Sequence, residues 1–456
     1  MIPPKPASSE GRTGLLHYLR HFRRDLLSAL PARLYRAWMA EFRAGPIHSF
    51  VCNDPDLVTL VLRERPEDFP KSDRLREGLA PLLGRSVFVT NGEEWRRQRR
   101  IIDPAFEGGR LREIFPQIWD ASLAAVQRLP TDAEIDLEPE TSHAAADVIF
   151  RTLFSIPIKD ATAAQVFAAF RAHQDAQPIV NAGALLPLPG WFPRLHSRRT
   201  RSTARHIRDL IAGLVDERAD RIADGNAPDD LATKIMTTPD PQTGATFTPS
   251  EMVDQVAIFF LAGHETSASS LAWALWLLAA NPDWQDRVAR EARDVLDVEN
   301  PDFSSISQLK FSRAAFREAL RLYPPVPMMV REATCPERFR DRDVPKGAQI
   351  VLSPWHLHRH ERLWDNPDGF DPGRWETENG RNCQRRAYIP FSAGARVCPG
   401  AGFAMVEGPL MLSMFLRSHR LETSAPPVPI ARLTVRGQNG IRVRISLRDP
   451  VATCHQ

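Results

Sequence analysis

Apolar residues recur at helical spacing through most of the chain, from about residue 110 to residue 325. The segments 210–222 and 284–296 show this period most clearly. Shorter, proline-punctuated segments with strand-like alternation lie near 45–63, 326–354 and 430–447. Because strand-like segments from both ends flank a helical middle, the sequence predicts a mainly α fold with a small β region. We expect residues 1–456 to form a single domain.

The longest apolar stretch predicts one long buried helix that starts at Thr248. Thr248 suits the N-cap, Pro249 suits the first helical position, and Glu251 completes a capping box. The pattern ends before Asn281, which gives a length of about 48 Å. A helix that is apolar on nearly all sides is buried in a core or in a membrane. The ionisable residues 264–265 at its middle would be costly in lipid, so we expect a core helix.

The composition is that of an ordinary globular protein, with 43% hydrophobic and 25% charged residues. This balance excludes disordered and collagen-like chains. The formal net charge of +3 gives no indication of a nucleic-acid partner. The five cysteines are odd in number, widely spaced and without a C-x-x-C pair. They favour a reducing, cytoplasmic location over a disulfide framework or a structural zinc or iron–sulfur site.

The N-terminus reads MIPPKP over residues 1–6 and continues with polar residues. No apolar run typical of a signal peptide or a membrane anchor follows, so we expect no transmembrane segment. Residues 15–39 are basic and partly amphipathic. This pattern suits a weak contact with a membrane surface or, as we expect, a helix that packs on the protein's own body.

One cysteine stands in a setting that favours a thiolate. Cys398 lies in the segment 391–400, FSAGARVCPG, directly before a helical pattern over 401–416. A helix N-terminus favours an anion and lowers the pKa of a thiol, and Gly394 and Gly400 permit turns that point N–H groups at the sulfur. Such a thiolate is a good axial ligand for haem iron. The alternatives are a buried structural cysteine or a nucleophile with a histidine base.

The middle of the long helix, residues 262–267 (AGHETS), combines small and polar residues. Gly263 lets a flat group lie close to the backbone, and hydroxyl groups that bond back to the helix can open it locally. Glu265 and Thr266 place an acid beside an alcohol, and such a pair can pass protons into a dry site. The alternative is a polar break in a core helix that neighbouring groups satisfy.

The segment 391–400 resembles the haem-binding loop of the cytochrome P450 family, F-x-x-G-x-R-x-C-x-G. The matching residues are Phe391, Gly394, Arg396, Cys398 and Gly400. The resemblance implies that Cys398 is the axial ligand of the haem iron. It also implies a triangular, mostly helical fold in which haem b lies between the long helix and the cysteine-bearing helix.

Residues 262–267 are similar to the oxygen-activation motif of the same family, A/G-G-x-D/E-T-T/S. The resemblance implies that Ala262 and Gly263 lie beside the haem. It further implies that Thr266 hydrogen-bonds the bound dioxygen and that Glu265 relays protons.

Two further motifs imply a buried ion network behind the cysteine loop. Glu318 and Arg321 form an E-x-x-R pair followed by a proline-rich turn, as in the family. The segment 370–375 resembles the family's F-x-P-x-R-F, with Trp375 in place of phenylalanine and Arg374 as its arginine. A buried charged cluster must be fully paired, so we assign this one to folding and haem retention.

Arginines in three segments are expected to bind the haem propionates, because Arg suits bidentate carboxylate contacts. Trp95 and Arg99 match the family's W-x-x-x-R helix, and Arg331 and Arg396 are the other two arginines. The remaining arginines near this helix are expected to form a solvated face or a basic patch that docks an acidic electron donor. They are Arg96, Arg97, Arg100, Arg385 and Arg386.

The alternate histidines His356, His358 and His360 could share one strand face and bind a metal. No cysteine or carboxylate partner is evident, and the family has an H-R dipeptide here. We therefore interpret them as structural.

The resemblance implies a monooxygenase that inserts one atom of dioxygen into its substrate. NAD(P)H would supply electrons through a separate ferredoxin and ferredoxin reductase, because no fused reductase follows the last strand-like segment. The alternatives are a peroxide-driven haem-thiolate enzyme, which would not need Glu265 and Thr266, and a non-catalytic haem sensor. We expect a monomer.

The apolar candidates for the substrate pocket favour a hydrophobic substrate such as a fatty acid, terpenoid or steroid. They are Ile258, Phe259, Ala262, Val326, Pro327, Met328 and Met329. Lys71, Arg74 and Arg76 precede the Trp95 helix, and we hypothesise that one of them anchors a substrate carboxylate.

Overall fold

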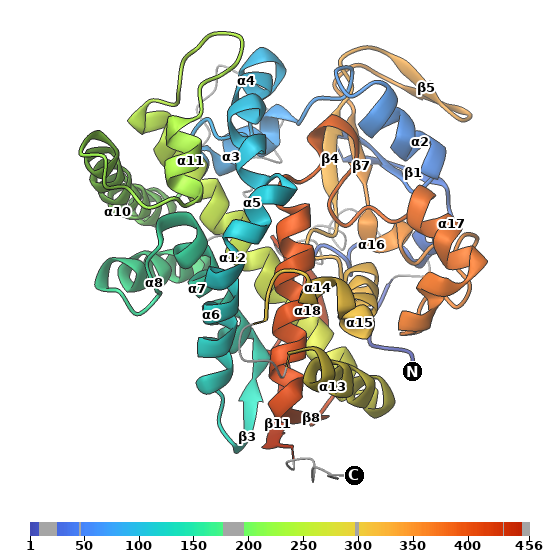
Figure 1. Ribbon diagram of the computed structural model, residues 1–456. Coiled ribbons are helices and arrows are strands. Elements are labelled where there is room, and N and C mark those ends of the chain that lie inside the picture. Colours follow the sequence, from blue (N-terminus) through green and yellow to red (C-terminus); the bar gives the residue numbers. More distant parts are fainter. Residues whose placement is uncertain (9–24, 45–46, 177–195, 297–300, 432, 449–456) are drawn as a thin grey trace.

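The computed structural model describes residues 1–8, 25–44, 47–176, 196–296, 301–431 and 433–448. Helices dominate these residues, and small sheets lie at their margin (Figure 1). The α-helices are α2 (Pro55–Thr59), α3 (Asp73–Leu83), α4 (Gly92–Ile102), α5 (Gly108–Glu113), α6 (Phe115–Gln127), α7 (Leu137–Phe154), α8 (Ala161–Ala176), α10 (Arg198–Ala223), α11 (Leu231–Thr237), α12 (Pro249–Ala279), α13 (Pro282–Leu296), α14 (Ser305–Gln308), α15 (Lys310–Leu322), α16 (Pro354–Leu357), α17 (Glu378–Arg386) and α18 (Ala401–Ser418). The predicted helices 210–222 and 284–296 lie within α10 and α13.

The strands form four sheets within the described residues. They are β1 (Met39–Ala44), β2 (Ile47–Cys52), β3 (Asp132–Asp136), β4 (Met329–Glu332), β5 (Glu337–Phe339), β6 (Arg342–Val344), β7 (Gln349–Leu352), β8 (His419–Thr423), β9 (Pro429–Ala431), β10 (Val435–Gly437) and β11 (Arg442–Leu447). The largest sheet has the order β1-β2-β7-β4, with β2 parallel to β7 and the other pairs antiparallel. Both ends of the chain therefore contribute strands, as predicted, and the expected mainly α fold with a small β region is confirmed.

One part of the strand prediction is wrong. Residues 55–59 form α2, and the short π-helical turn η2 (Leu60–Glu64) continues it, although 45–63 reads as strand-like. The carboxylate of Asp54 accepts a hydrogen bond from Asp56 N at 3.0 Å, and Pro55 occupies the first turn. The cap and the proline thus start a helix where the alternation of apolar residues predicts a strand.

The predicted long helix is α12, and it crosses α18 near the centre of the molecule (Figure 1). Its capping box is present: Thr248 N donates to the carboxylate of Glu251, and Glu251 N donates to Thr248 Oγ1. The helix packs against α7, α10, α15 and α18. Trp273 stacks on Tyr323 with ring centroids 3.9 Å apart. Among the described residues, no helix is long and apolar enough to cross a membrane.

The first residues of the chain pack on the region that follows α15. Phe370 N donates to Met1 O at 3.0 Å, and Tyr323 Oη donates to Pro4 O at 2.6 Å. Lys5 pairs with Asp368 at 2.5 Å. Residues 15–24 of the predicted basic segment 15–39 lie outside the described residues, and within the remainder the short helix η1 (Ala32–Tyr35) forms.

Candidate functional site

Cys398 lies in the turn between the short helix η5 (Gly394–Arg396) and α18. Its N–H donates to Phe391 O at 2.9 Å, and its carbonyl accepts from Ala401 N at 3.2 Å. Gly394 has φ +67°, and a Cβ there would lie 1.8 Å from Leu62 O, so only glycine fits this contact with η2. Gly400 has no positive φ, but a Cβ there would lie 3.8 Å from the cysteine sulfur. Gly394 therefore allows the turn to approach η2 closely, whereas the Gly400 N–H hydrogen-bonds the thiol.

The Cys398 residue is exposed to solvent, yet protein atoms enclose much of its surroundings. This burial raises the pKa of the thiol, whereas the Gly400 N–H, Arg99 and Lys71 lower it. The net shift is upward, so the expectation that the helix terminus would lower the pKa is wrong for the polypeptide alone. The reason is that desolvation outweighs the N–H group and the two cations. A metal ion on the sulfur would reverse this balance, because coordination deprotonates a thiol.

Four cations gather beside this turn and are called here the cationic group: Lys71, Arg99, Arg331 and Arg396. The electrostatic fields of the three arginines act on Lys71, and those of Arg99 and Arg331 act on Arg396. Burial lowers the pKa of Arg331 to about 10 and, together with Arg331 and Arg99, that of Arg396 to about 9. Both shifts mean that these guanidinium groups lack a balancing anion.

The contacts of the cationic group contain little negative charge. Arg396 lies over the Trp95 ring at 4.2 Å, and its Nη1 is buried without a hydrogen-bond partner in the described chain. Arg99 donates to Asp103 at 2.6 Å and to Val397 O at 2.8 Å. Asp103 is the one carboxylate that hydrogen-bonds to the group within the described ranges. Trp95, Arg99, Arg331 and Arg396, which come from three segments, are thus brought together.

An accessible strip runs along the otherwise buried α12. Ala262 is exposed, and Phe259, Gly263 and Thr266 are partly exposed, while most residues around them are buried. Their spacing places them on one face of the helix. Thr266 Oγ1 donates to Ala262 O at 2.5 Å, and α12 is continuous from Pro249 to Ala279. The hydroxyl therefore bonds back to the helix, but the expected local opening is absent from α12.

Gly263 packs closely against a neighbouring helix. A Cβ at this position would lie 2.5 Å from Cδ1 of Ile149 in α7. The missing side chain therefore makes room for Ile149. Gly263 is also partly exposed on the strip, and the approach of a flat group to it stays a prediction.

Glu265 points to a partner that is remote in sequence. It is 5% exposed, and its Oε1 accepts from Arg436 Nη2 of β10 at 2.8 Å. Its Oε2 has no hydrogen-bond partner in the described part of the chain. Burial raises the pKa of Glu265, and Arg436 opposes that rise. The adjacent Thr266 bonds to its own helix, so the acid and the alcohol have separate partners.

The predicted ion network behind the cysteine loop is present. Arg321 pairs with Glu318 at 2.8 and 2.9 Å, and Arg374 Nε donates to Glu318 at 2.9 Å. All three side chains are at most 4% exposed. Arg321 also donates to the carbonyls of His358, Pro367 and Gly369. The polar atoms of all three side chains are hydrogen-bonded, although two arginines share one carboxylate, and the network joins α15 to the chain that leads into the cysteine loop.

The histidines at 356, 358 and 360 are buried in this same region. The ring of His358 accepts from Ile389 N at 2.9 Å, and the ring of His356 bonds to Ser353 at 2.8 Å. Burial lowers the pKa of both rings to about 3. No group of metal-binding side chains occurs among the residues that the structure describes. These contacts agree with the structural interpretation.

The other predicted residues belong to the docking patch, the substrate pocket and the group near Lys71, and their contacts are as follows. Of the proposed docking patch, Arg96, Arg97, Arg100 and Arg386 each pair with a carboxylate. Among the substrate candidates, Ile258 and Pro327 are buried, while Val326 is 37% exposed. Arg76 pairs with Asp73 at 2.9 Å, and Lys71 belongs to the cationic group.

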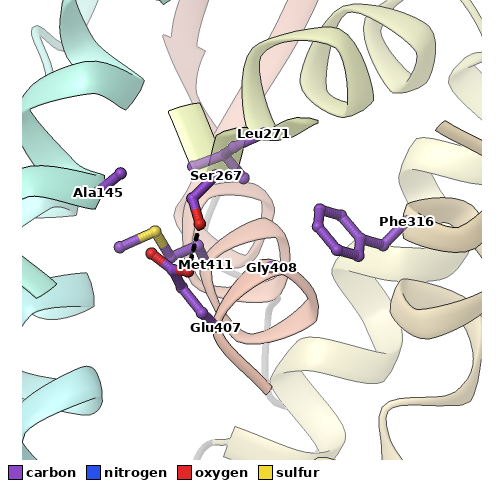
Figure 2. Close-up of a pocket in the computed structure, with 7 residues that line it drawn as sticks. All are labelled: Ala145, Ser267, Leu271, Phe316, Glu407, Gly408 and Met411. Atoms are coloured by element: carbon purple, nitrogen blue, oxygen red, sulfur yellow. Dashed lines mark hydrogen bonds between the residues drawn. The ribbon is translucent and has the colours of Figure 1, made fainter. Parts of the chain in front are cut away.

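A buried acid that the motifs did not indicate links the two central helices. Glu407 of α18 accepts from Ser267 Oγ of α12 at 2.6 Å, and Figure 2 shows the two side chains pointing toward one another. The pocket around them has room for about one water molecule. Its other lining residues are Ala145, Leu271, Phe316, Gly408 and Met411. Burial raises the pKa of Glu407 to about 7.

Comparison with known proteins agrees with this arrangement. A family model described as Cytochrome P450 matches residues 33–443. A Streptomyces melanosporofaciens protein named cyclooctat-9-en-7-ol 5-monooxygenase is 32% identical over 442 residues, which cover 94% of this chain and 92% of that protein. A cyclooctatin synthase from the same organism is 30% identical over 424 residues, which cover 91% of this chain and 88% of that protein. The crystal structure of a cytochrome P450DA heme domain, 23% identical, shares the fold with a TM-score of 0.81 over 99% of each chain. The chain therefore belongs to the cytochrome P450 family of monooxygenases.

Proposed function

We propose that this chain is a haem-thiolate monooxygenase in which Cys398 ligates the iron of haem b. The observation that carries the proposal is the setting of the thiol. It is accessible, it stands just before the N-terminus of α18, and the cationic group lies beside it. A thiolate in this setting is a good axial ligand for haem iron.

The charges of the site fit a haem. The cationic group contains four basic side chains and hydrogen-bonds to one carboxylate, that of Asp103. A haem b would bring two propionate carboxylates to these side chains, and its iron would keep the Cys398 sulfur as a thiolate. Arg331 and Arg396 would bind the propionates, because Arg331 and the Nη1 of Arg396 are buried and neither side chain has an anionic partner in the described chain. Trp95 would support Arg396 through its ring.

The accessible strip of α12 would face the site where the substrate reacts. A bound haem would supply the activation of dioxygen, so that one oxygen atom enters a substrate bond and the other leaves as water. Thr266 holds a proton at Oγ1 on this strip and can turn it from Ala262 O toward a reacting group. Glu265 can carry protons inward, because its buried Oε2 is unpaired in the described chain and burial keeps its pKa above the ordinary value.

A hydrophobic, terpenoid-like substrate is the favoured class. The accessible residues of the strip include Phe259 and Ala262, and Val326 exposes apolar surface at the turn after α15. Two relatives are named for cyclooctat-9-en-7-ol and for cyclooctatin. Fatty acids and steroids are the next classes to screen.

Electrons would come from NAD(P)H through a separate ferredoxin and its reductase. Val397, next to Cys398, is 39% exposed and offers the donor a short approach to the thiol. The four cysteines in the described residues are free, which suits the reducing cytoplasm. We also infer one structural domain, because a single cluster of buried residues draws on side chains from Leu27 to Ile445.

Substrate-dependent consumption of NAD(P)H and dioxygen tests the function. A hydrophobic substrate should accelerate both in the reconstituted enzyme and yield an oxygenated product. Thr266→Ala should divert reducing equivalents to hydrogen peroxide, whereas Thr266→Ser, which keeps the hydroxyl, should restore product. Product formation from peroxide alone, unaffected by Thr266→Ala, would favour a peroxide-driven enzyme. Binding of carbon monoxide without any substrate-dependent electron consumption would favour a haem sensor.

A further inference from the structure

Lys71 is held between the two arginines assigned to the propionates. Its N–H donates to Asn91 Oδ1 at 3.1 Å, and its carbonyl accepts from Asn91 Nδ2 at 3.0 Å. The same Oδ1 accepts from Arg396 Nη2 at 2.8 Å. On the other side, Pro70 O accepts from Glu332 N at 3.0 Å, which places Lys71 beside the strand of Arg331. Asn91 and β4 therefore fix the Lys71 backbone within the cationic group.

The ammonium of Lys71 has no anionic contact within the described residues. Nζ donates to Phe88 O and lies 3.5 Å from the centre of the Phe88 ring. A carbonyl and a ring face suit a cation, but they do not offset three neighbouring guanidinium groups. Burial and the arginines lower the pKa of Lys71 well below its ordinary value. The position calls for an anion, and one or two N–H donors remain to bind it.

These contacts also connect Lys71 to a loop. Residues 84–91 join α3 to α4 and carry both Phe88 and Asn91. Phe88 is 36% exposed, so the ammonium covers one face of a ring that solvent would otherwise reach. An anion bound to the Lys71 ammonium would therefore be connected to the 84–91 loop through the Lys71 side chain.

We propose that Lys71 is a further cationic ligand of the haem carboxylates and that, through Phe88, it fastens the 84–91 loop to the bound haem. This inference rests on the proposed function and names a residue of its cofactor site. It replaces the hypothesis that Lys71 anchors a substrate carboxylate, because the lysine lies with the propionate arginines.

The test compares the haem-loaded enzyme with Lys71→Met and Lys71→Arg, and with Lys346→Met as the control. Lys346 is exposed in the turn before β7. Haem transfer to excess apomyoglobin measures retention, and hydrogen exchange of residues 84–91 measures loop order. Lys71→Met should release haem at least about tenfold faster and lose protection in the loop, since a hydrogen bond between charged groups is removed. Lys71→Arg should stay close to the wild type, and the control should change neither readout.

Two results have different meanings. A wild-type enzyme that retains thiolate-ligated haem, together with Lys71→Met at the wild-type rate and loop protection, would overturn this proposal alone. A wild-type enzyme that binds no haem, or binds it without the thiolate, would overturn the proposed function and this proposal with it.

Discussion

The buried acid Glu407 makes stability depend on pH in a way that one substitution should remove. The side chain is 2% exposed, and its Oε1 has no hydrogen-bond partner in the described chain. Ser267 is its one hydrogen-bond donor there, and apolar side chains line the rest of the pocket (Figure 2). Burial raises its pKa from 4.5 to about 7. The folded protein therefore binds this proton more tightly than the unfolded chain does.

The sign and the size of the effect follow from this shift. An acid whose pKa is higher in the folded than in the unfolded state does not lower the unfolding free energy at pH values below its unfolded pKa. As pH rises above that value the unfolding free energy falls, until pH exceeds the folded pKa. The rise from 4.5 to about 7 corresponds to about 3.4 kcal/mol at 1.36 kcal/mol per pKa unit. Wild type should thus lose up to about 3 kcal/mol of unfolding free energy between pH 4.5 and pH 8 through this group.

Glu407→Gln should abolish that loss, because glutamine cannot ionise and can still accept from Ser267. The assay is urea unfolding at pH 5, 6, 7 and 8 for wild type, Glu407→Gln and the exposed control Glu376→Gln. The difference in unfolding free energy between wild type and Glu407→Gln should shift in favour of the variant as pH rises, and the control should follow wild type. Parallel pH curves for wild type and Glu407→Gln would refute the reasoning.

Two other predictions concern α12. Arg436→Leu removes the cation that opposes the rise in the pKa of Glu265, so the pH dependence of substrate-driven NAD(P)H consumption should shift to higher pH. An unchanged profile would show that Glu265 does not carry protons in turnover. Gly263→Ala should destabilise the fold by about 1–3 kcal/mol, because its Cβ would meet Cδ1 of Ile149. Ile149→Val lacks that methyl and should recover part of the loss in the double variant. Equal unfolding midpoints for wild type and Gly263→Ala would contradict the contact.

Local patterns in the sequence predict the elements that frame the site. The capping box at Thr248 and the all-round apolar run define α12, and the short motif around Cys398 locates the start of α18. Each of these features depends on neighbours within a few residues. The apolar alternation at 55–63 predicts a strand, but Asp54 and Pro55 start a helix there. Alternation alone gives no indication of a helix cap.

The rest of the site depends on contacts between distant segments. Glu265 meets Arg436, which lies 171 residues later on a strand with no recognisable motif. Lys71 lies close to Arg74 and Arg76 in the sequence, whereas folding places it with Arg331 and Arg396. Gly263 fits its motif, but its close contact with Ile149 of another helix is not visible in the motif. Such pairings come from tertiary packing, which a single sequence does not display.

The carbon monoxide difference spectrum of the reduced protein tests the central claim most directly. It should be recorded for wild type, for Cys398→His and for Cys335→Ser, in which the half-buried Cys335 serves as the control. The account predicts the red-shifted Soret band of thiolate ligation in wild type and Cys335→Ser, and its loss in Cys398→His. A wild-type protein without haem, or with the band typical of histidine ligation, would contradict the assignment of Cys398.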